Sequence, residues 1–174
     1  MRIATLLFLL STFTAAIAQD VATESAKESS KVEAIRQERI EKFTEMFGNK
    51  VLVGRFTIDG LDDQKRRAER YEIQKVTKAK KGDFWTIVAR MKYGDVDMKL
   101  PFMVEVKWAG KTPVITVDEM KLIGMKDSFD ARIVLDSGKY AGTWRHGKVG
   151  GLMFGRIEDA DKAKGDQDKV TNEQ

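Results

Sequence analysis

The 174-residue chain contains no cysteine, two prolines and a single histidine. The absence of cysteine excludes a disulfide framework and thiolate-ligated metal centres, and one histidine cannot form the common zinc sites. A domain without disulfides must be stabilised by its apolar core, for which 42% hydrophobic residues are sufficient. Few prolines and 14 glycines suit many strands joined by tight turns. We expect one packed domain with no metal and no cofactor.

Charge of neither sign dominates, since 31 Lys and Arg residues and 27 Asp and Glu residues leave a formal net charge of +4. This balance does not require a polyanionic partner. The most basic run, residues 65–70, follows two aspartates and is interrupted by Glu69, which favours a solvated loop over a polyanion site. No aromatic residues are interleaved among these cations, so nucleic acid is not an expected partner.

Residues 1–18 have the three parts of a secretory signal peptide. Arg2 supplies the positive start, residues 3–13 the apolar segment, and Ala16-Ile17-Ala18 a small-x-small cleavage site. The apolar segment is short for a bilayer span and no stop-transfer pattern follows it. We therefore expect an exported protein, periplasmic or extracellular, without a membrane span after cleavage. The alternative is a buried N-terminal helix.

A polar segment, residues 19–29, is predicted to be flexible. Ser30 and Glu33 then have the spacing of a capping box, which predicts the start of a helix. The apolar residues that follow fall within one arc of that helix, and Gly48-Asn49 suits its C-terminal end. Because the polar face carries both signs of charge, packing against the domain is favoured over binding to a membrane surface.

The clearest strand pattern lies between Val96 and Trp108, where every even-numbered residue is apolar. Alternation with a period of two indicates a strand with one buried face and one solvated face. The run exceeds a typical strand, and Pro101 marks a bend or bulge within it. Similar patterns predict seven further strands, one of them with a bulge near Gln74.

Eight strands joined by short turns and modest loops can hide their edges in a closed barrel or in a sandwich. The short connections favour an up-and-down antiparallel barrel, in which the first and last strands pair. These strands share a local pattern, Val53-Gly54-Arg55-Phe56 and Phe154-Gly155-Arg156-Ile157. The prediction is an all-β eight-stranded barrel with one N-terminal amphipathic helix, residues 30–158. A polar tail, residues 159–174, is predicted to be disordered.

Two resemblances accompany this pattern. The motifs Tyr140-Ala141-Gly142-Thr143-Trp144, His146-Gly147, Gly150-Gly151 and Phe154-Gly155-Arg156-Ile157, with residues 52–60 and 69–73, resemble the last and first strands of a family of uncharacterised secreted bacterial proteins. That likeness covers residues 47–158 and implies no assigned function. More distantly, Gly54-x-Phe56 after a short helix resembles the lipocalin opening, although lipocalins have tryptophan at the place of Phe56 and their later signatures are not evident. It implies a lipocalin-like or calycin-like barrel of unspecified ligand.

His146 is the one residue whose chemistry suggests a reaction, as a general base or a haem ligand. No nucleophile motif lies near it in the sequence, which favours a histidine at the barrel rim that is hydrogen-bonded to the backbone. The carboxylates cannot be paired from sequence, and no catalytic constellation is visible. An enzyme is therefore not expected.

The aromatic residues of the inward phase either fill the core or line a cavity. The function predicted is a secreted, non-catalytic barrel that binds a small apolar or amphipathic ligand. The alternative is a structural or interaction module with a filled core that contacts a cell-envelope or protein partner. The residues expected to line the ligand site are Trp85, Phe102, Trp108, Tyr140, Trp144 and His146.

Overall fold

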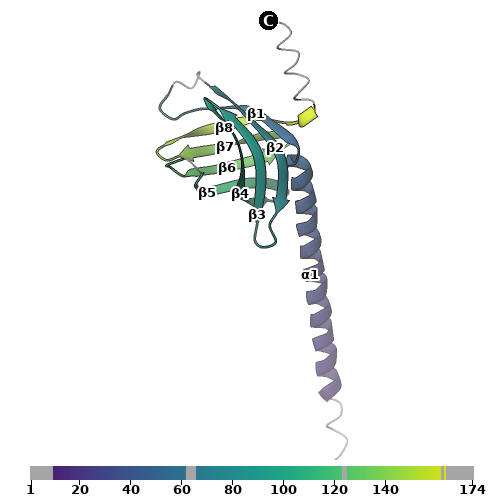
Figure 1. Ribbon diagram of the computed structural model, residues 1–174. Helices are drawn as coiled ribbons and strands as arrows, with labels where there is room; N and C mark the ends of the chain where they lie inside the picture. Colours follow the sequence, from purple (N-terminus) through teal and green to yellow (C-terminus); the bar gives the residue numbers. More distant parts are fainter. Residues whose placement is uncertain (1–9, 62–65, 123–124, 162, 164–174) are drawn as a thin grey trace, which may run out of the picture. The chain divides into compact units, whose positions relative to one another are not determined.

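The computed structural model describes residues 10–61, 66–122, 125–161 and 163, with side chains from residue 23 onward except at residue 93. The chain divides into two compact units, one ending at Glu41 and the other beginning at Lys42. The described residues contain the helix α1 and the strands β1 to β8, which are labelled in Figure 1. Their bounds are α1 Leu10–Phe47, β1 Lys50–Phe56, β2 Arg67–Lys78, β3 Phe84–Tyr93, β4 Val96–Ala109, β5 Thr112–Met120, β6 Phe129–Asp136, β7 Lys139–His146 and β8 Val149–Asp159.

The strands form a closed barrel in which each strand pairs with the next and β1 pairs with β8, all antiparallel (Figure 1). The predicted up-and-down barrel is confirmed by this pairing. Short connections between successive strands favour this arrangement, because closure gives the first and last strands a partner. In the seam between β1 and β8, Gly54 lies opposite Gly155. A Cβ on Gly54 would lie 2.1 Å from the Tyr140 hydroxyl, so this position has to be glycine for Tyr140 to fit.

One predicted irregularity is confirmed and another is wrong. The register between β2 and β3 shifts between Ile73 and Lys75, which is the bulge predicted near Gln74. Pro101 lies opposite Val88 in an unbroken register with β3, so no bulge occurs there. Pro101 belongs to the part of β4 that pairs with β3 only, and a strand with one free edge accepts a residue that cannot donate a hydrogen bond.

Helix α1 begins earlier than the capping pattern predicts. It is continuous from Leu10, so residues 19–29 are helical rather than flexible and Ser30 lies inside the helix. This stretch is rich in Ala, Glu and Lys, which favour helix strongly enough to override a weak start signal. The predicted end is confirmed, since the Gly48 N–H donates to the Thr44 carbonyl at 2.8 Å and Asn49 has a φ of 53°.

Parts of two other predictions lie outside the described residues. They are residues 1–9 of the predicted signal peptide, and residues 162 and 164–174 of the predicted disordered tail. Among the residues that the structure describes, no helix is both long and apolar enough to cross a membrane.

The last turns of α1 belong to the barrel unit. Phe43 and Phe47 are buried, and the Phe43 ring centroid lies 5.3 Å from that of Phe47 and 4.6 Å from that of Trp85. The three rings gather where β1 begins and β2 ends. Packing of the helix against the barrel is thus seen for its last turns, which contain Phe43 and Phe47.

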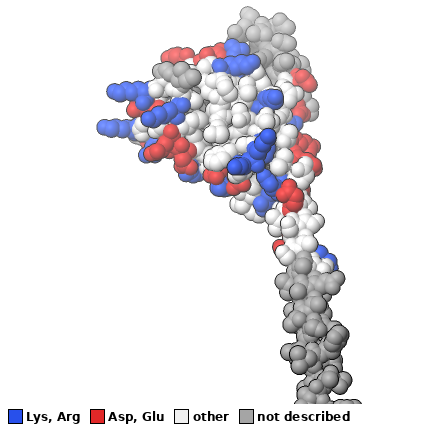
Figure 2. All heavy atoms as spheres, turned by 60° about the horizontal axis from the view of Figure 1, so that its bottom comes forward, with Lys and Arg blue, Asp and Glu red and all other residues white. Residues whose placement is uncertain are grey.

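Charged side chains cover much of the barrel exterior. Figure 2 shows acidic and basic groups interspersed around an area that carries neither. Several form ion pairs between neighbouring strands, such as Arg90 with Asp97 at 2.7 Å and Arg145 with Asp130 at 2.8 Å. Exposed pairs of this kind add little stability. The exterior also carries exposed apolar side chains, among them Met103, Val134 and Leu152.

Candidate functional site: the barrel cavity

The barrel interior contains a cavity of about 480 Å³. Its walls are mainly apolar side chains contributed by all eight strands, among them Leu52, Ile87, Phe102, Ile133 and Met153. Protein cores normally pack without voids larger than a water molecule. A volume of this size instead lies within the usual range of small-molecule sites, roughly 300–1,000 Å³.

Three of the six predicted site residues line this cavity and three do not. Phe102, Trp144 and His146 belong to its wall, whereas Trp85, Trp108 and Tyr140 do not. Trp85 is only 2% exposed because it packs under Phe43. The six share the inward phase of their strands, but the phase alone does not distinguish a side chain that fills the core from one that borders empty space.

Glu69 is a wall residue where two predictions overlap, the end of a basic run expected to be a solvated loop and the start of a strand predicted over residues 69–78; the strand is confirmed, and the loop is wrong for residues 67–70. The run contains the start of β2, and Glu69 is buried while Arg67 also lines the cavity. The signal that could have located Glu69 is its phase, since it is two residues from Tyr71 and four from Ile73 on the same strand. Lys65 lies outside the described residues.

The carboxylate of Glu69 is held by two phenols. The Tyr140 hydroxyl donates to Oε1 at 2.7 Å and the Tyr71 hydroxyl donates to Oε2 at 2.9 Å. Burial raises the pKa of Glu69 above its ordinary value, and the two hydrogen bonds oppose that rise. Burial, with the neighbouring carboxylate, also raises the pKa of Tyr140. Both oxygens of this buried acid therefore have donors supplied by the protein.

His146 differs from Glu69 in having an unsatisfied atom. Its ring stacks on Phe129 with centroids 4.0 Å apart and planes 9° apart. Its Nε2 is buried and has no hydrogen-bond partner within the described part of the chain. The backbone hydrogen bond expected of a rim histidine is therefore not made by this nitrogen. An unpaired buried polar atom costs about 1–3 kcal/mol, which a partner would recover.

Trp144 is fixed from two sides. Its indole N–H donates to the Thr57 carbonyl at 3.2 Å, and its ring meets Phe56 edge-on with centroids 5.7 Å apart. A Cβ on Gly151 would lie 3.1 Å from the indole nitrogen and 2.1 Å from the Thr57 oxygen. Glycine at this position thus lets the Thr57 carbonyl and the indole of Trp144 approach the backbone of β8 closely.

Comparison of the sequence with protein-family models gives no match, and comparison with curated proteins gives none at a significant level. The two resemblances noted from sequence therefore stay predictions.

The arrangement supplies binding surface and few reactive groups. Among the described residues, no three His, Asp or Glu side chains come together in a way that would hold a metal ion. Glu69 is engaged with tyrosines and His146 with Phe129. What the geometry offers is a cavity with a largely apolar wall.

Proposed function

We propose that the barrel binds one small apolar or amphipathic molecule in its cavity. The observation that carries this proposal is the interior cavity of about 480 Å³ with its largely apolar wall. Burying a ligand there removes apolar surface from water on both partners, at about 25 cal/mol per Å².

The alternative of a filled core that serves only as a scaffold is less well supported. The described interior is densely packed near Phe43 and Trp85, both almost fully buried, and open around Phe102 and His146. A scaffold would gain stability by filling the open part, because empty volume forfeits dispersion contacts. Volume left open in one part of the interior favours a binding role.

The wall of the cavity indicates the kind of ligand. Its largely apolar side chains match an apolar body. Glu69 needs no partner from the ligand because Tyr71 and Tyr140 already supply two hydrogen bonds. The ligand we propose thus has a mostly apolar surface.

A binding role also fits the arrangement of titratable groups better than catalysis. A raised pKa on a carboxyl in a cavity is a feature of some active sites. Here Glu69 has both oxygens occupied, and the recorded contact of His146 is with Phe129. We further propose that the protein is exported, as the pattern of residues 1–18 suggests, and meets its ligand in the periplasm or outside the cell.

The test is a fluorescence titration with N-phenyl-1-naphthylamine, a neutral apolar probe. We expect saturable binding of one probe per chain. Ala131 borders the cavity, so Ala131→Phe should fill it and weaken binding by about tenfold, equal to 1.4 kcal/mol. Ile133→Trp is a second filling variant. Thr143 is exposed on β7, so Thr143→Phe should bind as the wild type does.

Two results would overturn the proposal: no saturable binding to the wild type, or equal binding to folded Ala131→Phe and Ile133→Trp. Circular dichroism establishes that each variant is folded before it is titrated.

A further inference from the structure

The seam between β4 and β5 is only partly closed by backbone pairing. The two strands pair from Glu105 opposite Thr116 to Ala109 opposite Thr112. Residues 96–104 of β4 pair with β3 alone in the described structure. On the other side of the seam, the part of β5 beyond Thr116 pairs with β6 alone. Among the described residues, the two strands therefore share a ladder at one end of this seam and none at the other.

A bulge in β5 begins where the ladder stops. The register with β6 shifts between Val117 and Met120, and Glu119 has a φ of 47°, which is costly for a residue with a side chain. A bulge bends its strand and increases its twist. Thr116 belongs to the last residue pair of the ladder, and its hydroxyl donates to the Glu105 carbonyl at 3.2 Å. Beyond Thr116, no described residue of β5 pairs with β4.

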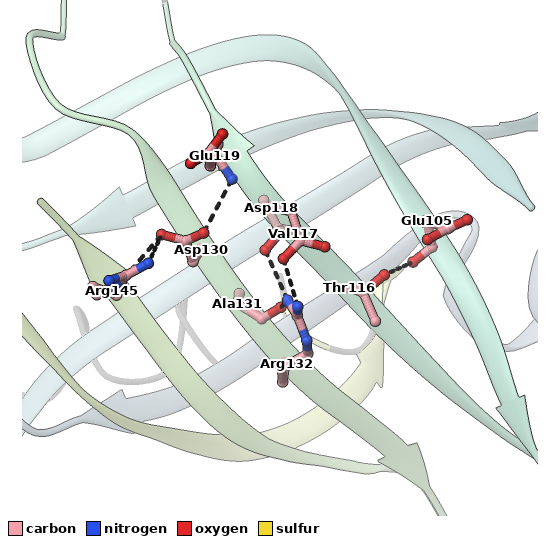
Figure 3. Close-up of polar contacts among 9 residues, drawn as sticks. All are labelled: Glu105, Thr116, Val117, Asp118, Glu119, Asp130, Ala131, Arg132 and Arg145. Atoms are coloured by element: carbon pink, nitrogen blue, oxygen red, sulfur yellow. Dashed lines mark hydrogen bonds and ion pairs between the residues drawn. The ribbon is translucent and has the colours of Figure 1, made fainter.

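The bulge is held in place by side chains of β6 (Figure 3). The Glu119 N–H donates to Asp130 Oδ1 at 3.0 Å. The Arg132 guanidinium donates to the Val117 carbonyl at 2.9 Å and also to the Asp118 carboxylate. These bonds satisfy the backbone groups that the bulge removes from the ladder. The bulged end of β5 is therefore a stable feature of the fold.

Both sides of this unpaired seam border the cavity. Val96, Phe102 and Val104 of β4 and Val117 and Met120 of β5 belong to the cavity wall. No ladder hydrogen bond between described residues of the two strands closes this part of the wall. Passage here requires side chains to move, whereas a paired seam opens only when ladder hydrogen bonds break.

The free edge of β4 is poorly suited to accept another strand. Pro101 lacks the N–H that a ladder needs, and charged Asp97 and Lys99 flank it on the outer face. Asp97 is tied to Arg90 by hydrogen bonds of 2.7 and 2.8 Å. Proline and charged residues are common ways of protecting a sheet edge. These features argue against the addition of another strand at this edge. They are compatible with the passage of a small molecule between β4 and β5.

We infer that the seam between residues 96–104 of β4 and the bulged end of β5 is a lateral entrance to the cavity. A small apolar or amphipathic molecule passes between the two strands by displacing side chains, and the barrel ladders stay intact. This inference rests on the proposed function. The inference predicts that a substitution on the path changes the association and dissociation rates by the same factor. The reason is that the substitution changes the free-energy barrier to passage and not the free energy of the bound state.

The first test needs no ligand. Amide hydrogen exchange of the free protein, followed by NMR, should show every second amide of residues 96–104 exchanging about a hundredfold faster than its neighbours, since edge amides lack a ladder partner. The amides of residues 85–92 of β3, which pairs with β2 on one side and with β4 on the other, should all be protected. Uniform protection of residues 96–104 would overturn the entrance even if the cavity binds the probe.

The second test is stopped-flow binding of N-phenyl-1-naphthylamine. Met98 is half-buried on β4 beside the seam, so Met98→Trp should slow association and dissociation by about tenfold each and leave Kd within twofold. Leu100→Trp is a second variant in the same stretch, and Thr143→Trp on fully paired β7 is the control. Unchanged rates in both folded seam variants, or a change in Kd through dissociation alone, would overturn the entrance. Absence of probe binding to the wild type would instead count against the proposed function.

Discussion

The hydroxyl of Tyr140 donates a 2.7 Å hydrogen bond to Oε1 of Glu69 across the barrel interior. The two residues lie on β7 and β2, which are not neighbours in the sheet. Tyr140 fits there because Gly54 and Gly155, paired across the seam of β1 and β8, have no side chains. A carboxylate, a phenol and two glycines from four strands therefore form one structural unit beside the cavity.

Removing the Tyr140 hydroxyl should destabilise the fold. Tyr140→Phe leaves Oε1 of a buried acid without its donor, which costs about 1–3 kcal/mol. Tyr71 is less buried than Tyr140, so Tyr71→Phe is the matched variant and should cost less. Urea unfolding measures both free energies. Equal stability of Tyr140→Phe and the wild type would contradict a structural role for this hydrogen bond.

The raised pKa of Glu69 links stability to pH. The folded protein holds the Glu69 proton at pH values where the unfolded chain, with a pKa near 4.5, has lost it. The associated stabilisation is fully present below the unfolded pKa and is lost as the pH rises through the folded pKa. Glu69→Gln cannot titrate, so its stability relative to the wild type should improve as the pH is raised across that window. Urea unfolding at a series of pH values checks this, and a constant difference would contradict it.

Gly54→Ala should be among the most damaging small substitutions in the barrel. The added Cβ would meet the Tyr140 hydroxyl at 2.1 Å and the Phe154 carbonyl at 2.3 Å, and the backbone contact cannot be relieved by a rotamer change. We expect a loss of about 3 kcal/mol, at the upper end of typical overpacking costs. Gly150→Ala is the control, because its nearest atom would be the Trp144 oxygen at 3.0 Å. Thermal unfolding that ranks the two variants equally would contradict the account.

The end of helix α1 should matter more to the barrel than its middle. Phe43 is fully buried against Trp85, so Phe43→Ala should cost about 3–5 kcal/mol. Val32 is 56% exposed, and Val32→Ala should change stability by less than about 0.5 kcal/mol. Chemical denaturation followed by tryptophan fluorescence compares them. Similar effects of the two substitutions would mean that Phe43 does not stabilise the barrel.

The barrel could be predicted because its evidence is local. Alternation along β4 and short turns define eight antiparallel strands, and closure follows from the need to pair both edges. The bulge near Gln74 could also be predicted, because the alternation of apolar residues along the strand is interrupted there. The bulge predicted at Pro101 does not occur, because proline is accepted at a free strand edge as well as in a bulge. Only the incomplete pairing of β4 with β5 shows that Pro101 lies at a free edge.

The cavity wall could be predicted only in part because volume is a property of the packed interior. Phe102 and Trp85 share the inward phase, yet Trp85 lies beneath Phe43 and Phe102 borders open space. Glu69 was missed because its charged neighbours in the sequence suggested a loop. The alternation that places Glu69 on the same face as Tyr71 does indicate an inward side chain. Its partner Tyr140 could not be predicted, because it lies 71 residues away along the chain.

Native mass spectrometry tests the central claim most directly. The wild type and Ala131→Phe are each incubated with a total bacterial lipid extract, separated from free lipid and sprayed under non-denaturing conditions. The account predicts one small molecule per wild-type chain, lost on denaturation, and none or far less on folded Ala131→Phe. No bound mass on the wild type, or the same bound masses on both proteins, would contradict a ligand-binding cavity.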